Sequence, residues 1–194
     1  MSPRTQKQFE QMRESSREVI LDAAFELFAK QGYHNTSIEQ IRKKAGVSKG
    51  LIYNYFGKKE DLMTGAFLRL MEEAEDFVKE VLTEENPREQ LKRLIDFSLD
   101  YIERDEEQLR LLTAISLQMN DFPELKNILK ARYSSLMPMF VDLFKRMEVP
   151  EPEMEAHLLA GYFDGIGMQK IVLGDALDLE WARKNLYKKF QLSE

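Results

Sequence analysis

The chain has 194 residues, 43% of them hydrophobic and 32% charged, which is enough for a buried core and for a small domain beside a larger one. Cysteine is absent, so disulfides and thiolate metal sites are excluded. The net charge of −6 argues against nucleic acid, but it is unevenly distributed. Residues 1–59 hold 11 lysines and arginines against 6 acidic residues, a net of +5, whereas residues 60–194 hold 17 against 28, a net of −11. A basic N-terminal part (residues 1–59) joined to an acidic body (residues 60–194) suits phosphate binding by the N-terminal part.

The first 18 residues are polar and lack the apolar core of a signal peptide, and no apolar run is long enough to cross a bilayer. We therefore expect a cytoplasmic protein that does not bind membranes. We expect these polar residues to form an N-terminal arm that precedes the first helix. Apolar residues at helical spacing from Val19 to Phe28 then predict a first amphipathic helix, which Gly32 ends.

Residues 33–62 predict two short helices joined by a tight turn. Thr36 is placed to cap the first helix, with Glu39 three residues later completing a capping box. Gly46 ends that helix because glycine accepts a left-handed backbone without steric cost, and Ser48 can cap the next helix. A turn of about three residues is typical of a helix-turn-helix.

The second helix of this pair has an apolar and a polar side. Its predicted anchors are Leu51, Ile52, Tyr55 and Phe56. The residues left to face a major groove are Lys49, Gly50, Tyr53 and Asn54. Lys49 suits guanine acceptors and Asn54 suits adenine, although many such contacts go to the DNA backbone instead. Gly50 would permit close approach, since it has no side chain.

The region from Ile20 to Leu62 resembles the DNA-binding domain of the TetR family of bacterial regulators. The resemblance rests on Ala23-Ala24, Leu27-Phe28, Gly32-Tyr33, Thr36-Ser37-Ile38, Ala45-Gly46-Val47-Ser48, Leu51-Ile52-Tyr53-Asn54-Tyr55-Phe56 and Lys59-Glu60-Asp61-Leu62. It implies an all-α fold. A three-helix DNA-binding domain with its N-terminal arm would occupy residues 1–59, and a helical effector-binding and dimerisation domain residues 60–194.

The resemblance also implies individual DNA contacts. Lys59 aligns with a family lysine at the start of the connecting helix, where the ammonium and the helix N-terminus can share one phosphate; the alternative is a solvated surface lysine. Tyr55 aligns with a phosphate contact, but it and Tyr53 could equally be core residues. Ser37 and Ser48 can act as caps and also donate to phosphate.

Arg17 and the arm before it are expected to touch phosphates or a minor groove, although a solubilising tail is nearly as plausible.

The rest of the chain also predicts helices. The connecting helix runs from about Lys59 to Leu82, and the later helices start at Asn86-Pro87, at Asp105, at Asp121-Phe-Pro-Glu124 and at about Glu153, with a last helix after Gly174. Pro138 lies inside the long helix that follows Asp121 and should kink or split it near Ser134 to Leu136, because proline removes a backbone hydrogen bond.

The helix from about Glu153 to Leu173 contains interior glycines, which cost about 1 kcal/mol each relative to alanine and therefore suggest close helix packing. The segment from Asp164 to Met168 resembles a dimer helix of the family, whose last two helices form a four-helix bundle with a second copy. The predicted interface residues are Ala160, Gly161, Asp164, Gly165, Met168 and Trp181. The alternative is packing of the same face within one chain.

A ligand site in the body is harder to define from sequence. Aromatic and methionine side chains offer an adaptable apolar lining, and each candidate could instead be core. The candidates are Phe67, Met71, Phe97, Tyr101, Met119, Tyr133, Met137, Phe140, His157 and Phe163. His157 and Glu153 alone do not make a metal site. No arrangement of nucleophile, base and orienting residue occurs, so neither an enzyme nor a bound cofactor is expected.

These patterns together favour a homodimeric TetR-like transcription regulator. We expect a repressor that leaves a palindromic double-stranded DNA operator when a small apolar or amphipathic effector enters the body. One alternative keeps the fold but replaces the effector with a recruited protein partner. Another is a helical lipid-binding protein or acyl enzyme with an incidental helix-turn-helix.

Overall fold

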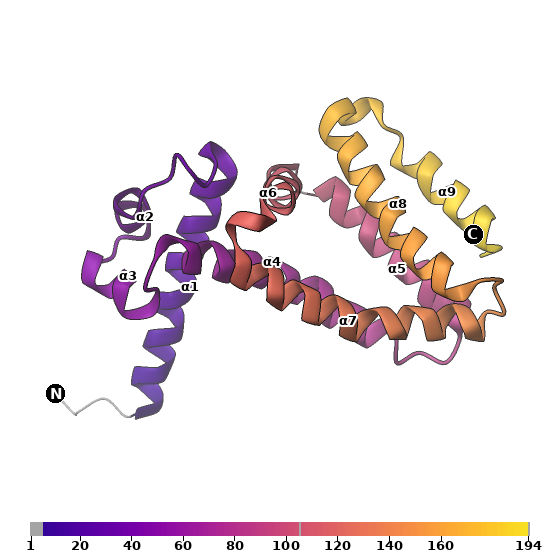
Figure 1. Cartoon of the computed structure of the whole chain (residues 1–194), viewed down its shortest axis with the longest axis horizontal. Helices are drawn as coiled ribbons and strands as arrows, with labels where there is room; N and C mark the ends of the chain where they lie inside the picture. The colour runs from indigo at the N-terminus through magenta and orange to yellow at the C-terminus, as the bar shows by residue number, and fades with distance from the viewer. Residues whose placement is uncertain (1–5, 105, 194) are drawn as a thin grey trace. The chain divides into compact units, whose positions relative to one another are not determined.

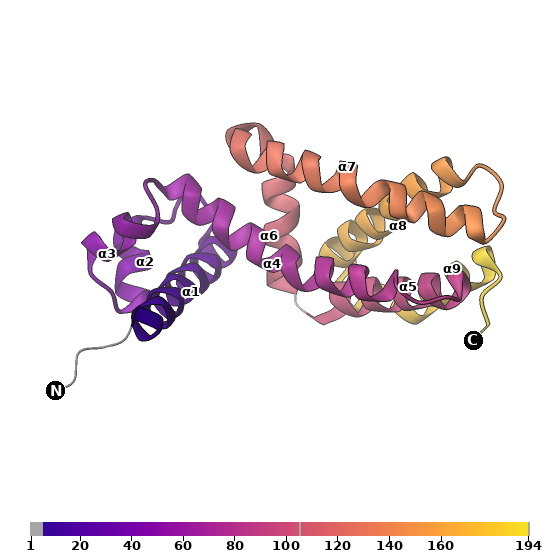
Figure 2. The same ribbon diagram turned by 90° about the horizontal axis from the view of Figure 1, so that it is seen from below.

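The computed structural model describes residues 6–104 and 106–193. Every regular element in this part of the chain is a helix, as the sequence predicts, and the predicted helix starting at Asp105 begins outside it. Figures 1 and 2 show two views. The elements are α1 (Gln6–Gln31), α2 (Ile38–Ala45), α3 (Lys49–Tyr55), α4 (Lys59–Val81), α5 (Pro87–Arg104), α6 (Glu106–Leu117), the 3-10 turn η1 (Met119–Asp121), α7 (Pro123–Arg146), α8 (Pro152–Leu173), the 3-10 turn η2 (Gly174–Ala176) and α9 (Leu179–Phe190).

The chain divides into two compact units, Met1–Met71 and Glu72–Glu194. The division falls inside α4, later than the boundary at residue 59 that the sequence suggests. Helix α4 is therefore shared: its first half belongs to the N-terminal unit and its second half to the C-terminal unit.

The N-terminal unit packs α2, α3 and the start of α4 around α1 (Figure 1). Its buried apolar side chains include Ile20, Leu21, Ala24, Phe28, Ile41, Ile52, Phe56, Leu62 and Met63. Gly65 allows α4 to approach α1 closely, since a Cβ atom there would lie 2.9 Å from Cδ2 of Leu21. Arg69 adds ion pairs from α4 to Glu18 (2.8 Å) and Asp22 (2.7 Å) on α1.

Helix α1 begins much earlier than the sequence suggests. The polar residues before Val19 were expected to form an arm, but the helix already starts at Gln6. Glutamine, glutamate, methionine and arginine have good helix propensity, and no glycine or proline interrupts the segment after Pro3. The pair Glu14 and Arg17, three residues apart and 3.8 Å from nitrogen to oxygen, supports the same helix.

The C-terminal unit buries α5 among α7, α8 and α9. Its core contains Val81, Leu91, Leu94, Ile95, Leu99, Leu143, Phe144, Leu159, Leu186 and Phe190. Helix α8 packs against α7 near the loop that joins them (Figure 2). Of the kink or split that the sequence predicts for α7, the split is wrong, because the helix continues through Pro138 from Pro123 to Arg146; the kink stays a prediction. Proline removes one bond of the helical ladder, and the remaining bonds and the packing of Leu143 and Phe144 hold the helix together.

Candidate nucleic-acid interface

The turn between α2 and α3 has the geometry that its sequence predicts. Gly46 adopts a left-handed backbone with φ of 68°, and the N–H of Val47 donates to the carbonyl of Arg42 at 3.2 Å, which closes a Schellman motif. The hydroxyl of Ser48 accepts a hydrogen bond from the N–H of Leu51 at 3.1 Å and caps α3. Three residues therefore separate two well-defined short helices.

The cap of α2 differs from the predicted one. Ser37, not Thr36, caps the helix, and its partner in the capping box is Gln40, not Glu39. The N–H of Gln40 donates to Oγ of Ser37 at 3.2 Å, and the N–H of Ser37 donates to Oε1 of Gln40 at 2.7 Å. Thr36 is buried instead, and its hydroxyl donates to the carbonyls of Gly32 (2.8 Å) and Leu27 (3.2 Å).

Glu39 takes another role on the surface of α2. It pairs with Arg42, whose side-chain hydrogen bond lowers the pKa of Glu39.

Helix α3 presents the polar face that the sequence assigns to DNA. Ile52 and Phe56 are buried and fix the helix on the unit, whereas Lys49 and Asn54 are exposed and Tyr53 is 46% exposed. A Cβ added at Gly50 would meet no described atom within 4 Å, so the backbone is open to close approach there. Leu51 and Tyr55 are only half-buried.

Two arginines on α1 lie beside the end of α3. The guanidinium of Arg17 lies 5.9 Å from the ring centre of Phe56, and that of Arg13 lies 6.0 Å from the ring centre of Tyr55. Arg17 also pairs with Glu14 and Glu18. Arg13 was not singled out from the sequence; its position four residues before Arg17, on the same face once α1 is extended, is the signal that would have identified it.

Lys59 lies at the start of α4, as predicted, but its ammonium has partners within the chain. It donates to the backbone carbonyls of Tyr33 and Thr36, each at 3.0 Å, and lies 4.1 Å from the ring centre of Tyr33. The neighbouring Lys58 is exposed. A DNA phosphate would therefore compete with these two carbonyls for the ammonium of Lys59.

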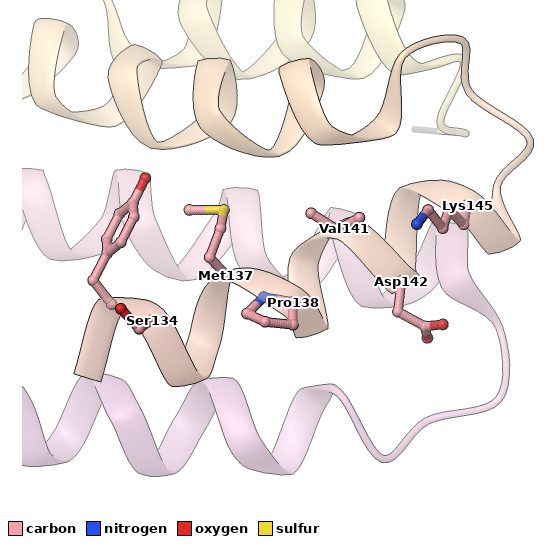
Figure 3. A pocket seen from close by; sticks show the side chains of 7 residues that line it. Ser134, Met137, Pro138, Val141, Asp142 and Lys145 are labelled. Atoms are coloured by element: carbon pink, nitrogen blue, oxygen red, sulfur yellow. The ribbon is translucent and has the colours of Figure 1, made fainter. Parts of the chain in front are cut away.

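The ligand candidates of the C-terminal unit separate into groups. Tyr133 and Met137 line an open groove of about 650 Å³ on one side of α7, together with Ser134, Pro138, Val141, Asp142 and Lys145 (Figure 3). The Tyr133 hydroxyl is hydrogen-bonded to Nδ1 of His157 at 2.7 Å. Phe140 and Phe163 pack against the core.

A second group of ligand candidates forms an aromatic row between α4 and α5. Phe97 stacks on Phe77 with ring centres 4.0 Å apart, and Tyr101 lies 6.2 Å from Phe97. The sequence does not indicate Phe77 as a member of this aromatic row. Met71 and Met119 are half-buried, and Phe67 is buried in the N-terminal unit.

The outer face of α8 is apolar and open. No described atom lies within 4 Å of a Cβ added at Gly161 or Gly165. Met168 is 42% exposed, and Trp181 at the start of α9 is 63% exposed. Asp164 is exposed on α8, but partial desolvation by its neighbours raises the pKa of its carboxyl, and Ala160 is half-buried. Sequence reasoning missed further exposed members of this face, namely Met154, Leu158 and Val172.

These two units correspond to two known domain families. A family model of bacterial regulatory proteins of the tetR family matches residues 20–65, and a model of the tetracyclin repressor-like C-terminal domain matches residues 87–186. The chain belongs to the TetR family. It is accordingly a DNA-binding transcriptional regulator with a helix-turn-helix, and the TetR family is not one of enzymes.

Similar TetR-family regulators match between two thirds and nine tenths of the chain. The HTH-type transcriptional regulator BetI of Stenotrophomonas maltophilia is 27% identical over 176 residues, covering 88% of this chain and 89% of that protein. The fatty acid metabolism regulator protein of Bacillus subtilis is 30% identical over 139 residues, covering 68% and 70%.

Solved structures share the fold. A transcriptional regulator from Rhodococcus sp. Rha1 superimposes with a TM-score of 0.78 at 21% identity, covering 90% of this chain and 94% of that one. A regulator from Saccharomonospora viridis, crystallised with choline, gives a TM-score of 0.74 at 23% identity, covering 92% and 96%. Within the described residues, no helix has both the length and the apolar character needed to cross a bilayer.

Proposed function

We propose that this regulator represses transcription in the cytoplasm as a homodimer that binds a palindromic DNA operator through α3. The observation that carries this proposal is the exposed face of α3, where Lys49, Tyr53 and Asn54 project from a helix fixed by buried Ile52. A serine cap and a left-handed glycine set the geometry of the turn before it. In this proposal Lys49 and Asn54 read base edges, and Ser37, Ser48, Tyr55 and Arg17 contact phosphates.

The outer face of α8 supports the homodimer. Its exposed or open positions are Met154, Leu158, Gly161, Gly165, Met168 and Val172. The intervals between them are four, three, four, three and four residues, so the row reads the same in both directions. An antiparallel second copy would place Gly161 against Gly165, with larger apolar residues at both ends, as a two-fold contact requires. Trp181 on α9 and Ala160 would extend this interface.

We further propose that a small apolar or amphipathic effector binds the C-terminal unit. The α7 groove offers Tyr133, Met137 and Val141 as apolar lining, and the aromatic row offers Phe97 and Tyr101. The relative crystallised with choline and the fatty acid regulator of Bacillus subtilis support a small-molecule effector for this chain as well. Occupation of the C-terminal unit would then lower operator affinity through α4, which extends into both units.

The test is selection of DNA by the purified protein from a random pool, followed by sequencing. We expect enrichment of a two-fold symmetric site, because a two-fold dimer presents two copies of α3. The variant carrying both Lys49→Ala and Asn54→Ala is the matched control and should enrich no such site while remaining folded and dimeric. Enrichment of a site without symmetry, or none with the wild type, would contradict the proposal.

A further inference from the structure

Three groups hold the side chain of Lys59, and all of them belong to the turn between α1 and α2. Two are the carbonyl oxygens of Tyr33 and Thr36, each 3.0 Å from Nζ, and the third is the ring of Tyr33, whose centre is 4.1 Å from Nζ. Tyr33 is 8% exposed and Thr36 is 2% exposed. The lysine thus joins the first residue of α4 to two buried residues of a turn more than 20 residues earlier in the chain.

The same turn is also joined to α1. The hydroxyl of Thr36 donates to the carbonyls of Leu27 and Gly32, and the amide of Gln31 donates to that hydroxyl at 3.1 Å. The turn leads directly into Ser37, the N-cap of α2. Any movement of the turn would therefore displace the N-terminus of α2, where free backbone N–H groups can bind a phosphate.

We propose that Lys59 is a positioning residue that fixes the α1–α2 turn to the start of α4, and that it does not neutralise a DNA phosphate. An ammonium that already donates to two carbonyls over an aromatic ring has most of its donor capacity in use. Its removal would leave those carbonyls without that donor, so the turn and the N-terminus of α2 would lose their fixed position. This inference rests on the proposed operator binding by the N-terminal unit and assigns one residue within it.

Two roles for Lys59 predict different salt dependences. Each lost phosphate contact lowers the slope of log affinity against log salt by about 0.9, because one condensed counterion fewer is released. A lost positioning contact weakens binding at every salt concentration but leaves that slope close to the wild-type value. The slope therefore separates the two roles, whereas affinity at a single salt concentration does not.

The experiment compares Lys59→Met, which keeps the aliphatic chain but removes the donors, with Lys58→Met at the exposed neighbouring position. Thr36→Val is a second variant, which loosens the same turn without changing any charge. Each is measured for affinity to the selected operator over a range of salt concentrations and for amide hydrogen exchange at residues 33–38. Melting temperature establishes that each variant is folded, and Thr36→Val tests the proposal even if Lys59→Met unfolds.

We expect Lys59→Met and Thr36→Val to bind the operator roughly tenfold more weakly with an unchanged salt slope, as the loss of hydrogen bonds that hold the turn implies. Exchange at residues 33–38 should accelerate in both and stay at the wild-type rate in Lys58→Met. A slope lowered by about 0.9 in Lys59→Met would overturn the proposal. So would wild-type affinity in Thr36→Val, or equal acceleration of exchange in Lys58→Met. If the wild type itself binds no operator, the proposed function fails, which is a different result.

Discussion

Substitution of single side chains on α3 can distinguish contacts to DNA bases, which depend on the operator sequence, from contacts to phosphates, which do not. Asn54 is exposed on the proposed groove face, and asparagine can make a bidentate contact to adenine. We predict that Asn54→Ala relaxes the preference at one operator position and costs about 1–3 kcal/mol there, while binding to unrelated DNA changes little. Titration against operators substituted at each position measures this. Asn127→Ala, at an exposed position in the C-terminal unit, is the matched control, and a uniform loss across all operators would show that Asn54 contacts phosphate instead.

The revised cap of α2 gives a second test at the residue scale. Ser37→Ala should lower the free energy of unfolding by about 1 kcal/mol, because the N–H of Gln40 loses its acceptor. Glu39→Ala removes only an exposed pair with Arg42 and should cost less than that. Urea unfolding of both variants provides the comparison. A larger effect of Glu39→Ala would favour the capping box with Thr36 that the sequence suggests.

Residues with local roles were predictable, and those with distant partners were not. Gly46 and Ser48 follow from their own neighbours, since a left-handed residue and a serine cap are defined within a few positions. Thr36 and Ser37 are both suitable caps, but the Thr36 hydroxyl bonds instead to the carbonyl of Gly32 at 2.8 Å and to that of Leu27, nine residues earlier, at 3.2 Å. The partners of Lys59 lie 23 and 26 residues away, so no local pattern could indicate them.

At the scale of helices, the close approach of α4 to α1 depends on Gly65. A Cβ there would lie 2.9 Å from Cδ2 of Leu21, which is 1% exposed and therefore has little room to move. We predict that Gly65→Ala destabilises the protein by about 1–3 kcal/mol despite the better helix propensity of alanine. Gly50→Ala is the matched control, since its Cβ would meet no described atom within 4 Å and α3 lies outside the proposed dimer interface. Equal unfolding midpoints for the two variants in urea would contradict the predicted overpacking.

The existence of the helices could be predicted from the sequence because apolar residues recur at helical spacing throughout the chain. The ends of the helices are harder to predict where a polar segment suggests irregular structure. The segment before Val19 is polar but has good helix propensity, so α1 extends to Gln6. Pro138 does not split α7, since one missing backbone bond does not outweigh the packing of the rest of the helix.

At the scale of the whole molecule, Asp164 makes the proposed dimer sensitive to pH. Partial desolvation already raises the pKa of its carboxyl within one chain, and a second copy packed on α8 would bury it further. The dimer then binds a proton more tightly than the separate chains do, so dimer affinity should rise as pH falls through the raised pKa and decline as pH rises. Sedimentation at several pH values measures this, and Asp164→Asn should remove the dependence. Tighter dimers at higher pH would indicate that a cation of the second copy pairs with Asp164.

The proposed coupling between effector and operator depends on the complete proposed dimer. Helix α4 belongs to both units, so an effector that prefers one setting of the C-terminal unit can alter the spacing of the two α3 helices. DNA presents successive major-groove faces about 34–36 Å apart, so only a matching spacing binds well. Such coupling is typically worth about 1–3 kcal/mol, and linkage requires operator DNA to weaken effector binding by the same factor. An apolar compound that raises the melting temperature should therefore bind more weakly in the presence of operator than in its absence. Calorimetric titration with and without operator measures both affinities, and equal values would show that the compound binds without switching the regulator.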